Sequence, residues 1–211
     1  MIINRIVKKG NKDVTIHFDG DKFLILAVEV FFKSGLKKGE NLDEDRFTFF
    51  IEQNKLFHIK QKAFRLLGRR QHTISELRTK LWRKDYEKRL IESVIKDLND
   101  NGYLNDEDFI REFVTVKSKS KNWSSKRIKS ELRKRGLEEK KIELILGEMS
   151  IGSDLRNAMI LANKKFDHLT KKNLDKKELR NKLSAFLYTK GFDYKLIKDV
   201  CNEIFMNKSD I

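Results

Sequence analysis

The feature that most constrains how this chain can fold is a hydrophobic pattern that recurs along the sequence at constant offsets. The first copy consists of Leu77, Leu81, Tyr86, Ile91 and Val94. Residues of the same type recur in Ile128, Leu132, Leu137, Ile142 and Ile145, and again in Leu183, Leu187, Phe192, Ile197 and Val200. These spacings are typical of helices with one buried face. Because such repeats bury their apolar faces on their neighbours, we predict three tandem three-helix repeats in an elongated, curved array.

Helix boundary signals support the same repeat. Thr73 with Glu76 fits a capping box, and Asp175 with Glu178 resembles one. Asn105 precedes a run of acidic residues, which favours a helix start there. The second helix of each repeat is expected to end near one of three residues, namely Asp85, Gly136 or Gly191.

The amino-terminal region has a different period. Apolar and polar residues alternate at 14–18, and the turn at 19–21 separates this stretch from the apolar run 23–28. This is the pattern of a β-hairpin. Residues 2–8 can precede it as a third strand, and 28–34 and 43–53 can form helices that cover the sheet.

Together these patterns define the fold class and the domains. We predict a mainly α-helical protein whose repeats are preceded by a small antiparallel β-meander with covering helices. The period changes near Lys55, which separates the meander from the repeats. The expected domains are 1–54 for the meander and 55–106, 107–150 and 151–211 for the three repeats.

Composition restricts the functional classes. The chain has 47 Lys and Arg against 32 Asp and Glu, a formal net charge of +15, which favours polyanionic or acidic partners. Cys201 is the single cysteine, and the four histidines lack the spacing of a metal site, so we expect neither disulfide, metal nor cofactor. Phosphate-loop and nucleophile-elbow motifs are missing, so we predict that the protein is not an enzyme.

The sequence also bears on location. The longest apolar run, 23–28, is much too short to span a bilayer, and the amino terminus lacks the apolar stretch of a secretion signal. We therefore expect a cytoplasmic protein with no membrane partner.

The most distinctive local feature is a dense basic stretch at 117–135, where Glu131 is the only acidic residue. A solvated surface usually mixes both signs, so this stretch favours binding. If Ile128 and Leu132 face the core, Lys126, Arg133 and Lys134 project outward, with Arg127 and Lys129 beside them. The contact candidates in this stretch are Lys119, Lys121, Trp123, Lys126, Arg127, Lys129, Arg133, Lys134 and Arg135.

Two candidates have competing interpretations. Trp123 stands at the entrance of the basic helix, where it can either pack on its own helix as a hydrophobic staple or contact bases or a partner groove. Arg69 and Arg70 belong to a second basic cluster with acidic residues close by in sequence. A solvated face explains that cluster better than a contact does, but both arginines remain candidates.

Three segments of the sequence carry a family resemblance: RLLGRR at 65–70 followed by SELRTKL at 75–81, NGYLNDEDF at 101–109, and 123–136 with its basic helix. These segments resemble the RecX family, the regulatory proteins of the RecA recombinase. The middle segment is the most specific. The resemblance covers about 62–150 well and 154–205 more weakly, and the GLKKG segment at 35–39 resembles an extension found in one branch of the family.

The resemblance implies a non-catalytic monomer that binds RecA–DNA filaments in their helical groove. Such a protein modulates, and mostly inhibits, ATP hydrolysis, filament growth and strand exchange, and binds single- and double-stranded DNA more weakly. The alternative is a stand-alone nucleic-acid-binding protein, because three-helix units with a basic helix also describe helix-turn-helix domains.

Overall fold

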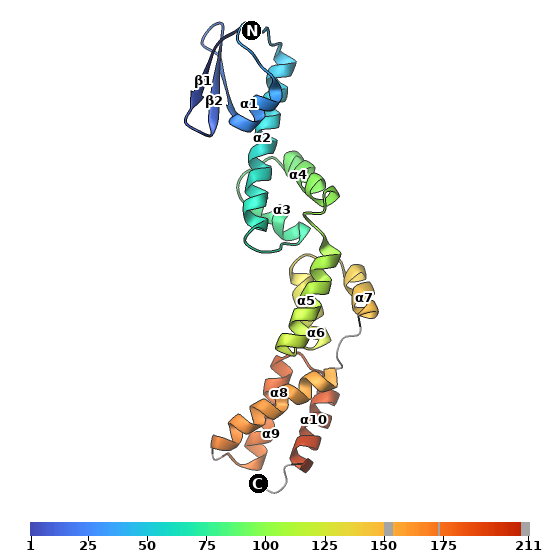
Figure 1. The fold of residues 1–211 in the computed structure, drawn as a ribbon. Coiled ribbons are helices and arrows are strands. Elements are labelled where there is room, and N and C mark those ends of the chain that lie inside the picture. Colours follow the sequence, from blue (N-terminus) through green and yellow to red (C-terminus); the bar gives the residue numbers. More distant parts are fainter. Residues whose placement is uncertain (150–153, 173, 208–211) are drawn as a thin grey trace. The chain divides into compact units, whose positions relative to one another are not determined.

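The computed structural model describes residues 1–149, 154–172 and 174–207, which fall into two compact units, Met1–Leu104 and Asn105–Ile211. Helices dominate both units, and a small antiparallel sheet lies at the amino terminus (Figure 1). The predicted fold class is therefore confirmed. The curvature and length of the array stay a prediction.

The sheet has three strands in the order β1-β2-β3, formed by Ile3–Lys9, Asp13–Phe18 and Phe23–Ala27. Both pairings are antiparallel, with Ile16 opposite Ile6 on one side and opposite Leu24 on the other. The alternation in β2 buries one face and leaves the other accessible, as the period of two requires. The predicted meander is confirmed.

Two helices cover the buried face of the sheet. Helix α1 spans Val28–Ser34, as predicted, and α2 spans Glu44–Leu67. The side chain of Asn54 in α2 accepts a hydrogen bond from the Ala27 amide (2.8 Å) and donates one to the Ile25 carbonyl (3.2 Å). This pair of bonds fixes α2 against the end of β3.

Helix α2 is longer than expected, and the prediction of a helix ending at Gln53 is wrong. The segment from Glu44 to Leu67 holds neither Gly nor Pro, so nothing in the chain interrupts the helix before Gly68. Phe50 packs in the core of the sheet, whereas Ile59 and Ala63 pack in the core of the first repeat. One helix therefore serves two cores, and the boundary predicted at 54/55 lies inside it. The division into four domains stays a prediction.

The first repeat combines the second half of α2 with α3 (Ile74–Trp82) and α4 (Lys88–Asp100). The Thr73 side chain accepts a hydrogen bond from the Glu76 amide at 3.0 Å, which confirms the predicted cap. After α3 the chain reverses through Asp85, whose φ is +58°.

The second unit begins with α5 (Asp106–Lys121), α6 (Ser125–Lys134) and α7 (Glu139–Glu148). The side chain of Asn105 accepts hydrogen bonds from the amides of Glu107 and Asp108, as its predicted role as helix cap requires. Ile110, Val114, Ile128, Leu132 and Ile142 form the centre of the core.

The third repeat consists of α8 (Asp154–Leu169), the short 3-10 helix η1 (Thr170–Lys172), α9 (Lys176–Thr189) and α10 (Tyr194–Asn207). Asp175 caps α9 by accepting from the Glu178 amide at 2.7 Å. The boundary predicted at 150/151 lies outside the described residues.

The repeated apolar positions behave alike in all three repeats. All of them are buried except Tyr86, which is half-buried. Gly136 and Gly191 take positive φ values of +77° and +88° after the second helices, as Asp85 does in the first repeat. The predicted repeat is therefore present in packing as well as in sequence.

Candidate binding surface

The basic stretch forms the end of α5 and all of α6. Ile128 and Leu132 are fully buried, so the opposite side of α6 faces solvent. Lys126, Arg133 and Lys134 are exposed, and Arg127 and Lys129 are half-buried beside them, as the helix period predicts. The predicted orientation of α6 is confirmed, whereas a contact with any ligand stays a prediction.

Carboxylates compensate part of this surface. Lys129 pairs with Glu143 (3.2 Å), Lys134 pairs with Glu131 (3.0 Å), and Arg133 forms a two-bond pair with Glu139. The hydrogen bond from Arg133 holds the pKa of Glu139 below its usual value. Two of these carboxylates belong to α7, so the surface is less positive than the sequence of α6 alone suggests.

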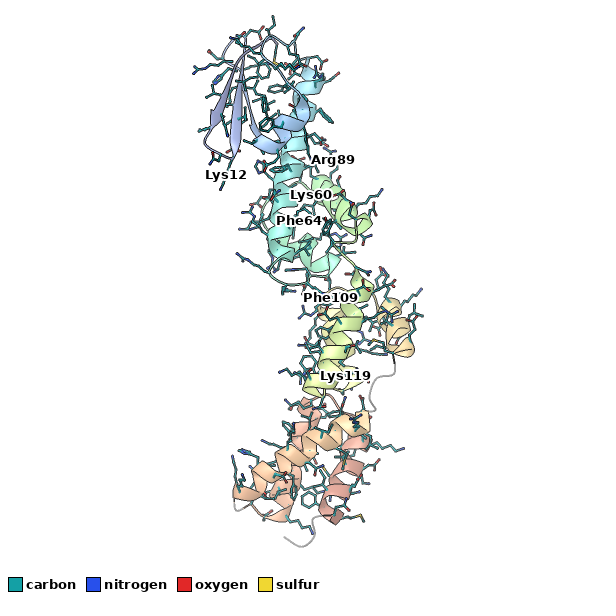
Figure 2. The ribbon with its side chains drawn as sticks, viewed as in Figure 1. Lys12, Lys60, Phe64, Arg89, Phe109 and Lys119 are labelled. Carbon is teal, nitrogen blue, oxygen red and sulfur yellow. The ribbon has the colours of Figure 1, made fainter. Side chains whose placement is uncertain are left out.

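The remaining lysines of the stretch are more open. Lys119 and Lys121 are exposed at the end of α5, where Lys119 is labelled in Figure 2, and Lys126 is exposed in the first turn of α6. None of the three forms an ion pair with another residue in the described parts of the chain. They are the cations of this surface with the least electrostatic compensation.

Trp123 is half-buried and lies within a group of rings and cations. Its ring is 6.2 Å from that of Phe113 in an edge-to-face arrangement, and the Arg127 guanidinium lies 4.1 Å from the indole centroid. The Lys117 ammonium lies 5.2 Å from the same centroid. Such contacts stabilise a packed aromatic side chain. They support the packing interpretation of Trp123, and its contact role stays a prediction.

Arg135 is also engaged in the fold. Its guanidinium lies 5.7 Å from the ring of Phe109 and 5.3 Å from that of Phe113, both in α5. The side chain is half-buried. Arg135 therefore joins the end of α6 to α5, which leaves less of it available to a partner than the sequence suggested.

The start of α6 is bonded to the third repeat. The buried Ser124 hydroxyl caps α6 by accepting from the Arg127 amide (3.1 Å), and it donates to the Lys190 carbonyl (3.2 Å). The Ser125 amide and hydroxyl both donate to Asp154 at 3.0 Å. These bonds hold the second and third repeats together within one unit, a role that the sequence did not reveal.

Arg69 and Arg70 lie in the other unit, in the turn after α2. Both are exposed, and Arg70 pairs with Glu76 at 2.8 Å. The buried His72 follows, with its Nδ1 2.9 Å from the Arg70 carbonyl oxygen and its Nε2 2.9 Å from the Lys80 ammonium. Burial lowers the pKa of His72. A neutral ring that donates from Nδ1 and accepts at Nε2 satisfies both contacts.

Comparison with known proteins identifies the family. Models of the first, second and third three-helix domains of RecX match residues 60–98, 105–146 and 153–201. The regulatory protein RecX of Clostridium botulinum (strain Alaska E43, type E3) is 30% identical over 198 residues, which is 93% of this chain and 92% of the relative. The chain belongs to the RecX family. A crystal structure of regulatory protein RecX shares the fold with a TM-score of 0.71 at 23% identity, over 94% of this chain and 98% of that chain. RecX from Lactobacillus salivarius has a TM-score of 0.62 at 23% identity, over 73% of this chain and 99% of that chain.

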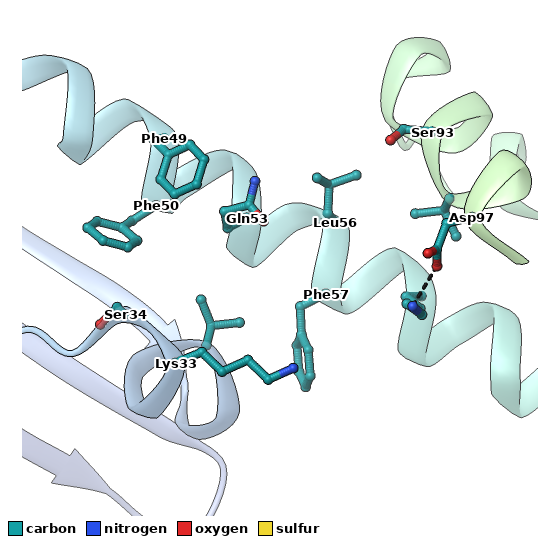
Figure 3. Close-up of a pocket in the computed structure, with 12 residues that line it drawn as sticks. Lys33, Ser34, Phe49, Phe50, Gln53, Leu56, Phe57, Ser93 and Asp97 are labelled. Carbon is teal, nitrogen blue, oxygen red and sulfur yellow. Dashed lines mark ion pairs between the residues drawn. The ribbon is translucent and has the colours of Figure 1, made fainter. Parts of the chain in front are cut away.

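The first unit of this RecX-family chain also contains a hollow of about 480 Å³ between α1, α2 and α4. Figure 3 shows Phe49, Leu56 and Asp97 at its lining, and Asp97 pairs with Lys60 at 2.5 Å. The rest of the lining is mixed, with apolar groups such as Phe50 and Val94 beside polar ones such as Lys33 and Gln53.

Across the described residues, no helix is both long and apolar enough to cross a membrane. The same residues contain no cluster of three or more His, Cys, Asp or Glu side chains with the geometry to hold a metal ion.

Proposed function

We propose that this chain is a non-enzymatic regulator that binds RecA–DNA filaments in their helical groove and mostly inhibits ATP hydrolysis, filament growth and strand exchange. The observation that carries the proposal is the match of all three repeats to the three-helix domains of RecX. The outward cations of α6 supply a surface suited to an acidic assembly of protein and DNA. In this proposal the protein acts as a cytoplasmic monomer and binds free DNA more weakly than the filament.

The direct test measures ATP hydrolysis by the cognate RecA on single-stranded DNA. A molar excess of this protein should lower the rate, and the protein alone should hydrolyse no ATP. Full RecA activity in the presence of that excess would contradict the proposal.

The second test addresses the surface. Replacing Lys126, Arg133 and Lys134 together by Glu should weaken binding to the filament by roughly a hundredfold or more at low salt, at about 1 kcal/mol or more for each contact. The same reversal at Lys171, Lys172 and Lys176, which are exposed in the third repeat, is the matched control and should have a smaller effect.

The control variant also distinguishes a binding site on α6 from a general attraction by the positive charge of the whole protein. If both variants weaken binding equally, the overall charge of +15 explains the attraction and the assignment to α6 fails. The melting temperature of the triple variant in α6 should fall by only a few degrees, because exposed ion pairs such as Lys134–Glu131 contribute under about 1 kcal/mol each.

A gel shift with and without RecA distinguishes the alternative function. A filament regulator should act on assembled filaments at concentrations where it hardly shifts a bare oligonucleotide. A stand-alone nucleic-acid-binding protein should shift the oligonucleotide equally well without RecA.

A further inference from the structure

One position recurs at the end of the second helix in every repeat and carries a large exposed side chain. It is occupied by Trp82 in α3, Arg133 in α6 and Tyr188 in α9. Each follows a fully buried leucine and stands three residues before the residue with positive φ. The position is therefore equivalent in the three repeats and points away from each core.

The exposure of the two aromatic residues is unusual for their size. Trp82 is 67% exposed and Tyr188 is 72% exposed. Neither forms a ring-to-ring contact with another residue in the described ranges. Trp123 differs, since Phe113, Lys117 and Arg127 surround its ring. Trp82 and Tyr188 thus present ring faces that the fold does not use.

In the first repeat, exposed cations follow this position in the sequence. Arg83 and Lys84 follow Trp82 and are exposed, and neither takes part in an ion pair within the part of the chain described. In the middle repeat, Arg133 pairs with Glu139, the first residue of α7. The equivalent of Glu139 is Lys88 in the first repeat and the 78% exposed Tyr194 in the third. The first repeat therefore has a cation, and the third a second ring, where the middle repeat has a carboxylate.

We propose that Trp82 and Tyr188 are stacking positions for the bases of single-stranded nucleic acid, with Arg83 and Lys84, the cations next to Trp82, on its phosphates. An exposed ring beside unpaired cations is the combination that binds single strands without sequence preference. A single strand is favoured over a duplex because its bases offer free faces to a ring. This inference rests on the nucleic-acid part of the proposed function and adds specific residues and a strand type to it.

Tryptophan fluorescence tests the inference on the full chain. An oligodeoxythymidylate should quench the parent protein, and Trp82→Phe should remove most of that quenching while retaining a ring. Trp82→Ala and Tyr188→Ala should each weaken binding of a labelled oligodeoxythymidylate by roughly fivefold to a hundredfold. Phe49→Ala is the matched control, because Phe49 is 54% exposed but lines the hollow between α1, α2 and α4. It should leave binding unchanged.

Several results would overturn the inference. These are binding of the oligonucleotide without quenching of Trp82, an equal loss in the Phe49 control, and equal affinity for a duplex of the same sequence. Quenching by RecA alone, but not by the oligonucleotide, would make Trp82 a protein contact instead.

The inference and the proposed function can fail separately. Inhibition of RecA without any oligonucleotide binding would overturn the stacking positions and leave the regulatory function standing. Quenching of Trp82 by the oligonucleotide without inhibition of RecA would support the stacking positions and contradict the regulatory function.

Discussion

Helices α3 and α6 occupy equivalent places in their repeats but have different surroundings. Both bury two apolar residues one turn apart, and both start with a hydroxyl cap, Thr73 or Ser124. The start of α6 is bonded to the third repeat, whereas the start of α3 is held by the local contacts of His72. The apolar pattern therefore determines the repeat, and the polar residues around it determine how each helix is anchored.

The largest effect is expected from the shared apolar positions. Leu132→Ala and Leu81→Ala should each lower the free energy of unfolding by about 2–5 kcal/mol, because both side chains are fully buried. Chemical denaturation measures the loss. Hydrogen exchange should then show lower protection mainly in Asn105–Ile211 for the first variant and in Met1–Leu104 for the second. Equal loss in both units for either variant would mean that the units unfold as one.

The features that α3 and α6 share are those that the sequence predicts. The repeat, the helix caps and the sheet follow from periods and capping residues, which are local signals. The outward direction of Lys126 and Arg133 follows from the same helical period. Local patterns sufficed wherever the structure depends on neighbours in sequence.

Contacts between separate helices could not be predicted from the sequence. Glu139 and Glu143 reduce the positive charge of α6 from a separate helix, and Asp154 at the start of α8 accepts a hydrogen bond from Ser125 at the start of α6. The length of α2 was underestimated because its first half faces the sheet and its second half faces the repeat, which changes the apolar face along one helix. No sequence signal indicates that the side chain of Lys80 lies beside His72.

The junction between the second and third repeats predicts the next effect. Gly191 has a φ of +88°, and a Cβ there would lie 2.7 Å from the Ser124 hydroxyl and 2.9 Å from the Arg127 Cβ. Gly191→Ala should therefore be more destabilising than Gly102→Ala. At Gly102 φ is +74° with open space around a Cβ, so only the left-handed backbone cost of about 1–2 kcal/mol applies. An equal decrease in melting temperature for both variants would show that Ser124 and Arg127 can move to accommodate a Cβ at position 191.

His72 makes the anchoring of α3 sensitive to pH. Its pKa is lowered by burial, so the unfolded chain binds a proton more readily than the folded chain, and stability falls as the pH drops below about 6.5. Two cations, Arg70 and Lys80, and one carboxylate, Glu76, face the ring. His72→Gln should reduce the fall in melting temperature between about pH 7.5 and about pH 5.5.

The matched variant for this pH effect is His58→Gln, which removes an exposed histidine from α2. It is the control for removing a histidine that does not contact α3. The pKa values of the Glu92 and Glu139 carboxylates are also lowered, but they affect stability only below about pH 4.5. They therefore do not contribute to the change in melting temperature between about pH 7.5 and about pH 5.5. If the melting temperature of His72→Gln depends on pH as strongly as that of the parent, His72 does not make the anchoring of α3 sensitive to pH.

The smallest effect on stability, and the sharpest contrast between the two helices, is expected from their ion pairs. Arg78 pairs with Glu92 in the first repeat and Arg133 with Glu139 in the second, and all four side chains are well exposed. Solvent screens such pairs, so Glu92→Gln and Glu139→Gln should each change the free energy of unfolding only slightly. Binding should separate them. Glu139→Gln removes the carboxylate that occupies Arg133 and leaves that guanidinium free for a phosphate or a carboxylate of the filament, so affinity should rise. Glu92→Gln removes the same charge but releases Arg78, which is not among the proposed contacts, so its gain should be smaller. An equal rise in both variants, measured by titration of filaments at low salt, would trace the attraction to net charge and remove the distinction between α3 and α6.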